Sequence, residues 1–220
     1  MQMTRMKFFL PLVFLFSILS YADSEPEVWE KIYDEDGIIV ARKDVPGQDT
    51  FAFKATAEIA APLMRVASVL IDIERRNEWM PNLANAYIVE VLNDAERVEY
   101  FHVKTPFILK DRDFVVDAKA RWDKPTQTAT FSFSSIVHPK VPLTSKVRGE
   151  LYESKYILKS LGEKTAIELN VHVDPKGSVP KWIVNLFQKD YPRKTLERLK
   201  VQCVKPDIVI SPLVTKVMGN

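Results

Sequence analysis

The sequence has a single cysteine, Cys203, and few glycines and histidines. One cysteine excludes an intrachain disulfide, a metal site built from several thiolates and a redox Cys-x-x-Cys pair. His102, His138 and His172 fall on different expected elements and lack the spacing of metal ligands. A Gly-x-Ser-x-Gly sequence and a Gly-rich phosphate loop are also missing. We therefore expect no cofactor and no metal, and a stability that comes from burying apolar side chains.

The sequence also lacks a large net charge. The chain has 31 basic and 29 acidic residues, and the excess disappears without Arg5 and Lys7 of the N-terminal segment. A balanced chain has no general attraction to nucleic acid, so we expect no nucleic-acid partner. Hydrophobic residues make up 46% of the sequence, which is typical of a globular domain. These data leave monomer and dimer open, and we expect a monomer.

The N-terminus has the layout of a secretory signal peptide. Arg5 and Lys7 precede an apolar run over residues 8–19, and the small residues Ser20 and Ala22 suit a cleavage site. The run is too short for a membrane-spanning helix, which needs ~20 apolar residues. We predict a signal peptide over residues 1–22, with an uncleaved anchor as the alternative. The protein is then exported, to the periplasm in a Gram-negative bacterium and otherwise as a secreted protein.

The rest of the chain has a few strands and two helices, then many strands, then one long helix. Period-two alternation and turn residues predict strands over 29–33, 38–42, 50–59, 87–92, 97–104, 112–122, 128–136, 146–153, 155–161 and 165–173. The segments 146–153 and 155–161 are equally compatible with one bent strand. Asp36-Gly37 predicts a tight hairpin turn between the first two strands.

Helical spacing of apolar residues predicts helices over 62–71, over 72–79 and from about Ser178 through Pro192 to Cys203. The segment from Val204 onward has no clear periodicity and stays unassigned. This order of elements favours an α+β fold, in which a strongly curved antiparallel sheet has its concave face covered by the last helix.

Three pieces of sequence, in this order, resemble the START (StAR-related lipid-transfer) domains of the helix-grip, Bet v 1-like superfamily. They are Leu70-Ile71-Asp72 with Arg76 and Trp79, then Pro106 with the segment 110–115, and then the segment 174–182. The resemblance covers most of residues 27–203. It implies a helix-grip fold with one lipid in a hydrophobic cavity between the sheet and the C-terminal helix, and two loops and that helix as a lid. We divide the chain into a signal peptide (1–22), a START-like lipid-binding domain (23–205) and a C-terminal tail (206–220).

The expected ligand-binding residues lie at the end of the helix over 72–79, on the inward strand faces, in the loop over 105–109 and on the last helix. They are Trp79, Glu99, Phe101, Phe107, Leu109, Arg112, Phe114, Trp182, Ile183, Leu186 and Phe187. Apolar loops of this kind often contact membranes, so we expect transient membrane contact at 105–109. On the strand over 112–122, the face of Arg112 and Phe114 should point inward, and its small residues leave room for a ligand or for bulky neighbours.

Glu99 is the polar exception among these residues. On an inward face its carboxylate would need a cationic partner or a ligand hydroxyl, and Arg112 is the nearest candidate in strand order. Alternatively, Glu99 is exposed and Arg112 ties a loop to Asp111 or Asp113. Some sterol-binding members of the family have a basic residue where this chain has Ala118, which argues against sterol specificity.

We therefore expect a lipid-binding and lipid-transport protein that holds one hydrophobic small molecule and is not an enzyme. The first alternative is an enzyme similar to polyketide cyclases and aromatases, which would need several acidic, His or Tyr side chains converging on the same cavity. The second is a scaffold or inhibitor whose interior is filled by its own side chains.

Overall fold

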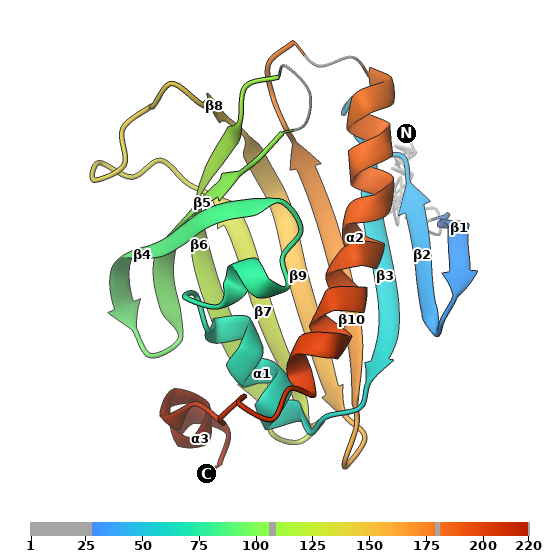
Figure 1. The fold of residues 1–220 in the computed structure, drawn as a ribbon, viewed down its shortest axis with the longest axis vertical. Helices are drawn as coiled ribbons and strands as arrows, with labels where there is room; N and C mark the ends of the chain where they lie inside the picture. The colour runs from blue at the N-terminus through green and yellow to red at the C-terminus, as the bar shows by residue number, and fades with distance from the viewer. Residues whose placement is uncertain (1–27, 106–108, 179–180, 220) are drawn as a thin grey trace, which may run out of the picture.

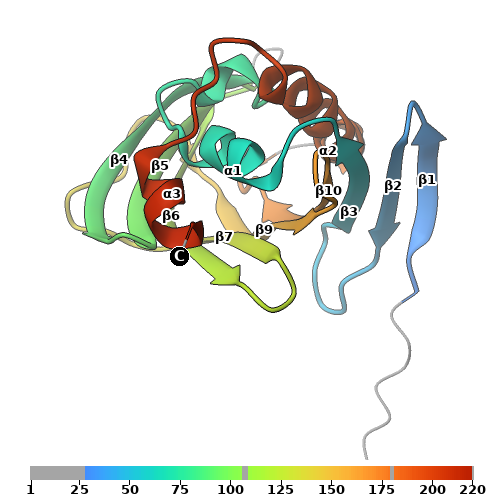
Figure 2. The same cartoon turned by 90° about the horizontal axis from the view of Figure 1, so that it is seen from below.

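The computed structural model describes residues 28–105, 109–178 and 181–219, and of residues 181–189 only the backbone. In the described part, ten strands form one sheet in the order β1-β2-β3-β10-β9-β7-β6-β5-β4, with β8 paired to β6. The sheet curves around the long helix α2, while β1 and β2 extend from its side (Figures 1 and 2). The α+β helix-grip fold expected from the sequence is confirmed.

The strands are β1 (Glu30–Glu35), β2 (Ile38–Lys43), β3 (Ala52–Ile59), β4 (Leu83–Asn93), β5 (Glu96–Val103), β6 (Arg112–Asp123), β7 (Thr128–Ser135), β8 (Val147–Arg148), β9 (Glu150–Ser160) and β10 (Thr165–Asp174). The helices are α1 (Leu63–Ile71), the 3-10 helix η1 (Arg76–Glu78), α2 (Lys181–Cys203) and α3 (Pro212–Met218). Neighbouring strands are antiparallel, except that β8 runs parallel to β6.

The β1–β2 hairpin forms as its turn sequence predicts. Asp36 and Gly37 have φ angles of 53° and 67°, the left-handed pair that a two-residue hairpin turn requires. Glycine adopts this conformation without a steric penalty, and Asp tolerates it better than most residues. The turn places Ile38 and Val40 in the main core, under the last turns of α2.

Strand β6 separates two apolar clusters on its two faces. Val116 and Ala118 belong to the main core on the concave side, which also includes side chains of α1 and α2. Val115 points the other way and packs with Val98 and other residues in a smaller cluster on the convex side. The inward face predicted for residues 112–122 is therefore confirmed, and the opposite face is less exposed than simple alternation suggests.

The predicted helix over residues 72–79 is wrong, because only the short helix η1 forms there. Asp72 ends α1, and its side chain accepts a hydrogen bond from the backbone N–H of Arg75 at 3.2 Å. The guanidinium of Arg76 then donates to the carbonyl oxygen of Leu70 at 2.7 Å. This bond folds the chain back over the end of α1 instead of letting a helix continue.

The predicted break between residues 153 and 155 is wrong, because β9 runs through it without interruption. The division falls instead at Gly149, which separates β8 from β9. The backbone N–H of Gly149 donates to the carbonyl oxygen of Asp113 at 3.0 Å. A Cβ atom at this position would lie 2.4 Å from the ring of Phe114. The bend therefore requires a residue without a side chain.

The tail that the sequence left unassigned contains the helix α3, which packs against α1 at the lower end of the sheet (Figures 1 and 2). Ile208 and Val214 are buried in the main core. The backbone N–H of Ser211 donates to Ser68 Oγ at 2.8 Å. Since α3 is only seven residues long, its apolar pattern is too short to be recognised in the sequence. Within the described residues, no helix is long and apolar enough to cross a membrane.

Candidate ligand cavity

A cavity of about 520 Å³ lies between the concave face of the sheet, the η1 region and α2. Its walls are mainly apolar and come from β3, β5, β6, β7, β9 and β10. The described lining residues are Phe51, Phe53, Leu70, Arg76, Trp79, Met80, Pro81, Asn82, Phe101, Val103, Lys104, Thr105, Arg112, Phe114, Phe133, Leu151, Ser154, Tyr156, Val171, Val173, Pro175, Asp190, Tyr191, Lys194 and Arg198. The volume falls inside the range of ~300–1,000 Å³ that is usual for small-molecule pockets.

Aromatic rings form a continuous part of the wall. The ring centroids of Phe101 and Phe133 are 6.5 Å apart, and those of Phe133 and Tyr156 are 6.1 Å apart. Trp79 meets Tyr156 edge-on with a centroid distance of 6.3 Å. Rings packed in this way hold one another in place, so the wall keeps its shape and offers a large apolar area to a ligand.

Behind the aromatic wall, two arginines share one buried carboxylate. Glu99 accepts hydrogen bonds from Arg76 of η1 and, at 2.6 Å, from Nε of Arg97. Arg97 also donates to the carbonyl oxygen of Ile71 at 2.7 Å, and Arg76 donates to that of Leu70. The three side chains thus fasten the last turn of α1 to β5.

The expected pairing of Glu99 with Arg112 is wrong, and so is the alternative of an exposed Glu99. Glu99 has no exposed surface, and it pairs with Arg76 and Arg97. The reason is the fold-back at η1, which brings Arg76 under α1 and next to β5. Sequence order gave no sign of this, because Arg76 lies outside the strands.

Arg112 instead binds backbone oxygens. Its guanidinium donates to the carbonyl oxygens of Lys110 at 2.6 Å, Lys176 at 3.1 Å and Pro175 at 3.2 Å. These bonds join the start of β6 to the loop between β10 and α2. Arg112 is only 5% exposed, and this burial lowers its pKa, while the charge of Asp111 opposes the shift. Among the described residues, no carboxylate forms an ion pair with Arg112.

The phenols in the cavity wall stay neutral. Burial raises the pKa of Tyr191 to about 12 and that of Tyr156 well above its ordinary value. Two buried donors of the wall, Nε of Arg76 and Nε1 of Trp79, have no hydrogen-bond partner among the described residues. Buried donors of this kind favour an acceptor group on whatever fills the cavity.

The structure brings together four of the predicted ligand-binding residues. Trp79, Phe101, Arg112 and Phe114 line the cavity. Glu99 lies behind the wall, and Leu109 is half-buried and does not belong to the described lining. Phe107 lies outside the described residues, as do the side chains of the α2 residues Trp182, Ile183, Leu186 and Phe187.

The prediction missed several aromatic and aliphatic lining residues on the other strands. They include Phe51, Phe53, Phe133, Tyr156 and Val171. Period-two alternation marks each of them as one face of a strand, which is the signal that could have found them. Alternation does not show which inward residues line a cavity and which pack against one another.

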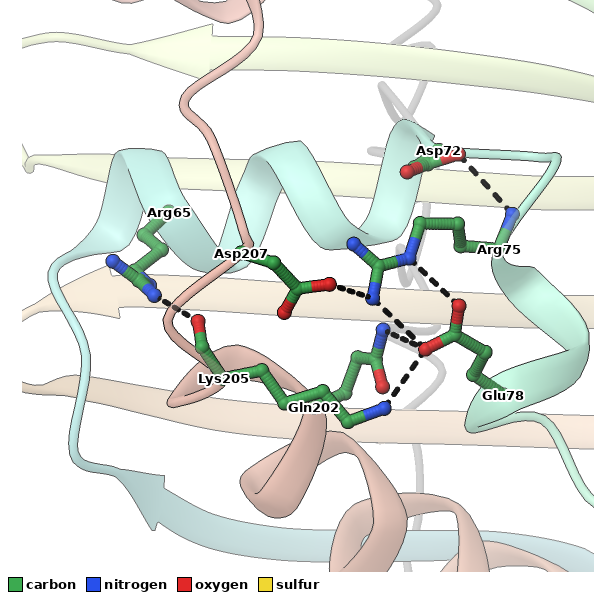
Figure 3. Close-up of polar contacts among 7 residues, drawn as sticks. All are labelled: Arg65, Asp72, Arg75, Glu78, Gln202, Lys205 and Asp207. Atoms are coloured by element: carbon green, nitrogen blue, oxygen red, sulfur yellow. Dashed lines mark hydrogen bonds and ion pairs between the residues drawn. The ribbon is translucent and has the colours of Figure 1, made fainter.

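The C-terminal end of α2 is tied to the η1 region by a polar cluster that includes the buried Gln202 (Figure 3). Glu78 accepts hydrogen bonds from Arg75 at 2.7 Å, Gln202 at 2.9 Å and Lys205 at 2.8 Å. The hydrogen bond from Arg75 is the largest of several contacts that hold the pKa of Glu78 well below its ordinary value. Arg75 also pairs with Asp207 at 2.8 Å.

A second contact of the same region runs from α1. Nε of Arg65 donates to the carbonyl oxygen of Cys203, the last residue of α2, at 2.7 Å. The guanidinium also donates to the carbonyl oxygen of Lys205. These oxygens would otherwise be unsatisfied at a helix end. These contacts therefore hold the C-terminal end of α2 firmly.

The described part of the chain has no set of side chains suited to binding a metal ion. No group of three or more His, Cys, Asp or Glu side chains there could hold a metal ion. The single thiol, that of Cys203, is buried, and burial raises its pKa to about 12.

Comparison with known proteins identifies the family to which this fold belongs. A family model described as START domain matches residues 17–204. START domain-containing protein 10 from Homo sapiens is 29% identical over 189 residues, which are 84% of this chain and 64% of that protein. Phosphatidylcholine transfer protein from Mus musculus is 26% identical over 168 residues, covering 74% of this chain and 77% of that protein. The chain thus spans less than two thirds of the length of START domain-containing protein 10.

Two solved structures show the same fold. The crystal structure of human STARD10 matches with a TM-score of 0.74 and 27% identity, covering 81% of this chain and 74% of that one. The STAR-related lipid transfer protein (fragment 25-204) from Xanthomonas axonopodis matches with a TM-score of 0.72 and 23% identity, covering 80% of this chain and 99% of that one.

Proposed function

Because the chain belongs to the START domain family, we propose that it is a lipid-binding and lipid-transfer protein that holds one hydrophobic ligand and leaves it chemically unchanged. The observation that carries this proposal is the 520 Å³ cavity, lined by eight described aromatic side chains together with aliphatic ones. Apolar area removed from water contributes ~25 cal/mol per Å², so a lipid chain with a few hundred Å² of surface would bind tightly. The cavity is also what distinguishes a carrier from a scaffold with a filled interior.

The polar groups of the cavity support a carrier rather than an enzyme. Asp190 is the one acidic residue of the described lining, and it pairs with Lys194 at 2.9 Å. Glu99 is held by two arginines, and the two phenols keep their protons at neutral pH. A cyclase or aromatase would need a group with a pKa near the working pH within reach of the ligand. The described lining offers no such group, although it has donors that can orient a head group.

We further propose that the protein is exported and works between membranes. Residues 1–22 have the signal-peptide pattern, which makes the periplasm its compartment in a Gram-negative bacterium and secretion its fate otherwise. The loop over 105–109, which carries Pro106 and Phe107, remains the proposed site of transient membrane contact. Intact-mass measurement of the protein from its own compartment tests the export proposal, since cleavage after Ala22 gives a single expected mass.

Lipid uptake is the direct test of the carrier proposal. Delipidated protein is mixed with lipids that carry a fluorescent acyl chain, and bound lipid is counted after gel filtration. We expect one lipid per protein. Ser154→Phe should abolish uptake, because Ser154 lines the cavity and a ring there occupies the space of the ligand. Ser134→Phe, on the exposed face of β7, is the matched control. Absence of uptake by the unaltered protein across several lipid classes would refute the proposal.

A further inference from the structure

The described lining of the cavity is unbalanced in charge. It contains five basic residues and one acidic residue. These are Arg76, Lys104, Arg112, Lys194 and Arg198 on one side and Asp190 on the other. Asp190 pairs with Lys194, and Glu99 behind the wall pairs with Arg76 but is shared with Arg97. The whole chain, by contrast, carries a formal charge of only +2. The positive charge is therefore a property of this site and not of the protein surface in general.

Three of the lining cations have no carboxylate within ion-pair distance in the described part of the chain: Lys104, Arg112 and Arg198. Arg112 has the greatest need for an anionic partner, because it is buried and its three hydrogen bonds go to neutral carbonyl oxygens. A guanidinium has five N–H donors, so donors remain after these bonds. The charge of Asp111 acts on Arg112 without forming an ion pair. A buried cation that is only partly compensated is costly, and a further anionic group nearby would offset that cost.

The other two cations mark where the cavity meets solvent. Lys104 follows the end of β5, and Arg198 lies on α2 one turn after Lys194. Lys104, Lys194 and Arg198 line the cavity and are also exposed, unlike Arg112. Positive charges from two separate elements, each where the cavity meets solvent, create a local field that attracts an anion and repels a cationic head group.

Resting on the proposed function, we infer that the ligand is an anionic lipid, whose carboxylate or phosphate is attracted by the positive charge of the lining, which comes from the buried Arg112 and from Lys104 and Arg198 at the rim. A zwitterionic phosphatidylcholine head group would bring its quaternary ammonium into the same field. Such a ligand would gain less from these cations than a lipid with a net negative charge. The aromatic wall would hold the acyl chain in either case, so the discrimination comes from charge.

A competition without membranes tests this inference, because vesicles would add their own attraction for basic side chains. Delipidated protein is incubated with equal amounts of oleate, phosphatidylglycerol and phosphatidylcholine, each solubilised by cyclodextrin, and the complexes are counted by native mass spectrometry. Oleate carries a carboxylate and phosphatidylglycerol a phosphate, so comparing their uptake shows which anionic group the protein prefers. We expect one or both to exceed phosphatidylcholine by about tenfold, and the preference to fall with rising salt.

Rim variants make the test specific for these residues. Replacing Arg112 also removes three hydrogen bonds to the backbone, so the double variant Lys104→Gln with Arg198→Gln is used instead. We expect it to lower the preference for anionic lipid roughly three- to tenfold, since each exposed cation contributes a few-fold. Lys124→Gln with Lys159→Gln removes the same charge from exposed residues away from the described lining, and should keep the preference.

The outcomes separate the two proposals. Equal or better uptake of phosphatidylcholine overturns the anionic specificity and leaves the carrier function standing. An equal loss of preference in both double variants overturns the role of the rim residues. If none of the three lipids binds, the carrier proposal itself fails.

Discussion

Arg76 of η1 and Glu99 of β5 form a buried ion pair in which the two side chains are 3% and 0% exposed. Arg97 donates to the same carboxylate, so one acid serves two guanidinium groups. The pair ties the end of α1 to the sheet, and it positions Arg76 in the cavity wall. A change in Glu99 therefore affects both the stability of the fold and the wall that would face a ligand.

Removing this carboxylate should be strongly destabilising. Glu99→Gln leaves two arginines with no anionic partner, and breaking a buried pair in this way costs about 3–5 kcal/mol. Urea unfolding followed by circular dichroism measures the change. Glu96→Gln on the same strand is the control, because Glu96 pairs with the exposed Lys119 and its loss should cost at most about 1 kcal/mol. Equal losses in the two variants would contradict the assigned role.

Acid should destabilise the protein partly through Asp113. Burial alone would raise its pKa, but hydrogen bonds from Arg148, Thr144 and Tyr100 and the charge of Arg148 hold the pKa below its ordinary value. A pKa lower in the folded than in the unfolded state contributes stability above the ordinary Asp pKa of about 3.9. That stability is lost as the pH falls through the lower, folded-state pKa.

Comparing unfolding at pH 7 with unfolding between pH 5 and about pH 2 tests this prediction. Asp113→Asn should be less stable than the unaltered protein at pH 7, and the difference should shrink in acid. The exposed Asp34→Asn serves as the control and should show a small difference at every pH, since Asp34 is half exposed in its pair with Lys31. A pH-independent deficit in Asp113→Asn would mean that packing rather than charge explains the loss.

Gly149 should be intolerant of a side chain. A Cβ atom would come within 2.5 Å of two ring atoms of Phe114, a distance that forces the ring to move. We expect Gly149→Ala to displace this ring toward the cavity, to lower stability by about 1–3 kcal/mol and to weaken lipid uptake. The double variant with Phe114→Leu should recover part of the stability, because a shorter side chain leaves room for the methyl group. Failure of that rescue would indicate that the backbone itself is strained.

The tail should contribute to stability although it lies outside the family match. Val214 of α3 is 4% exposed and belongs to the main core, whereas Val217 of the same helix is 37% exposed. Val214→Ala should cost about 1–3 kcal/mol in chemical unfolding, because it removes buried methyl groups. Val217→Ala should cost about 0.5 kcal/mol or less, as surface substitutions usually do. Equal, small effects would mean that α3 is not part of the cooperative fold.

Most of the fold was predictable from local patterns. Period-two alternation located most strands to within a few residues, although it placed a break inside β9, and Asp36-Gly37 predicted the first hairpin. The failures have one cause in common, which is that tertiary contacts decided short segments. The segment after Asp72 folds back because Arg76 binds the end of α1, and α3 forms on a surface that only the assembled sheet and α1 provide.

The cavity wall was only partly predictable. A strand pattern shows that Phe101 and Phe114 point inward, and the family resemblance drew attention to Trp79 and Arg112. Of the two partners of Glu99, Arg97 lies two residues away on the same strand, so alternation could have indicated it. The pairing with Arg76 was beyond sequence reasoning, because only the three-dimensional arrangement brings η1 next to β5. The charge imbalance of the lining likewise emerges only when β5, β6 and α2 come together.

Trp79 gives the protein an optical probe of its own occupancy. Its indole is 2% exposed, touches the ring of Tyr156 and lines the cavity, so its surroundings change when a ligand replaces water or empty space. Indole emission depends on polarity and on nearby quenching groups. Titration with an unlabelled lipid should therefore shift the intrinsic fluorescence, and Trp79→Phe should reduce that shift while leaving an aromatic ring in the wall, the remainder coming from the other three tryptophans. Binding can then be followed on native ligands that carry no dye.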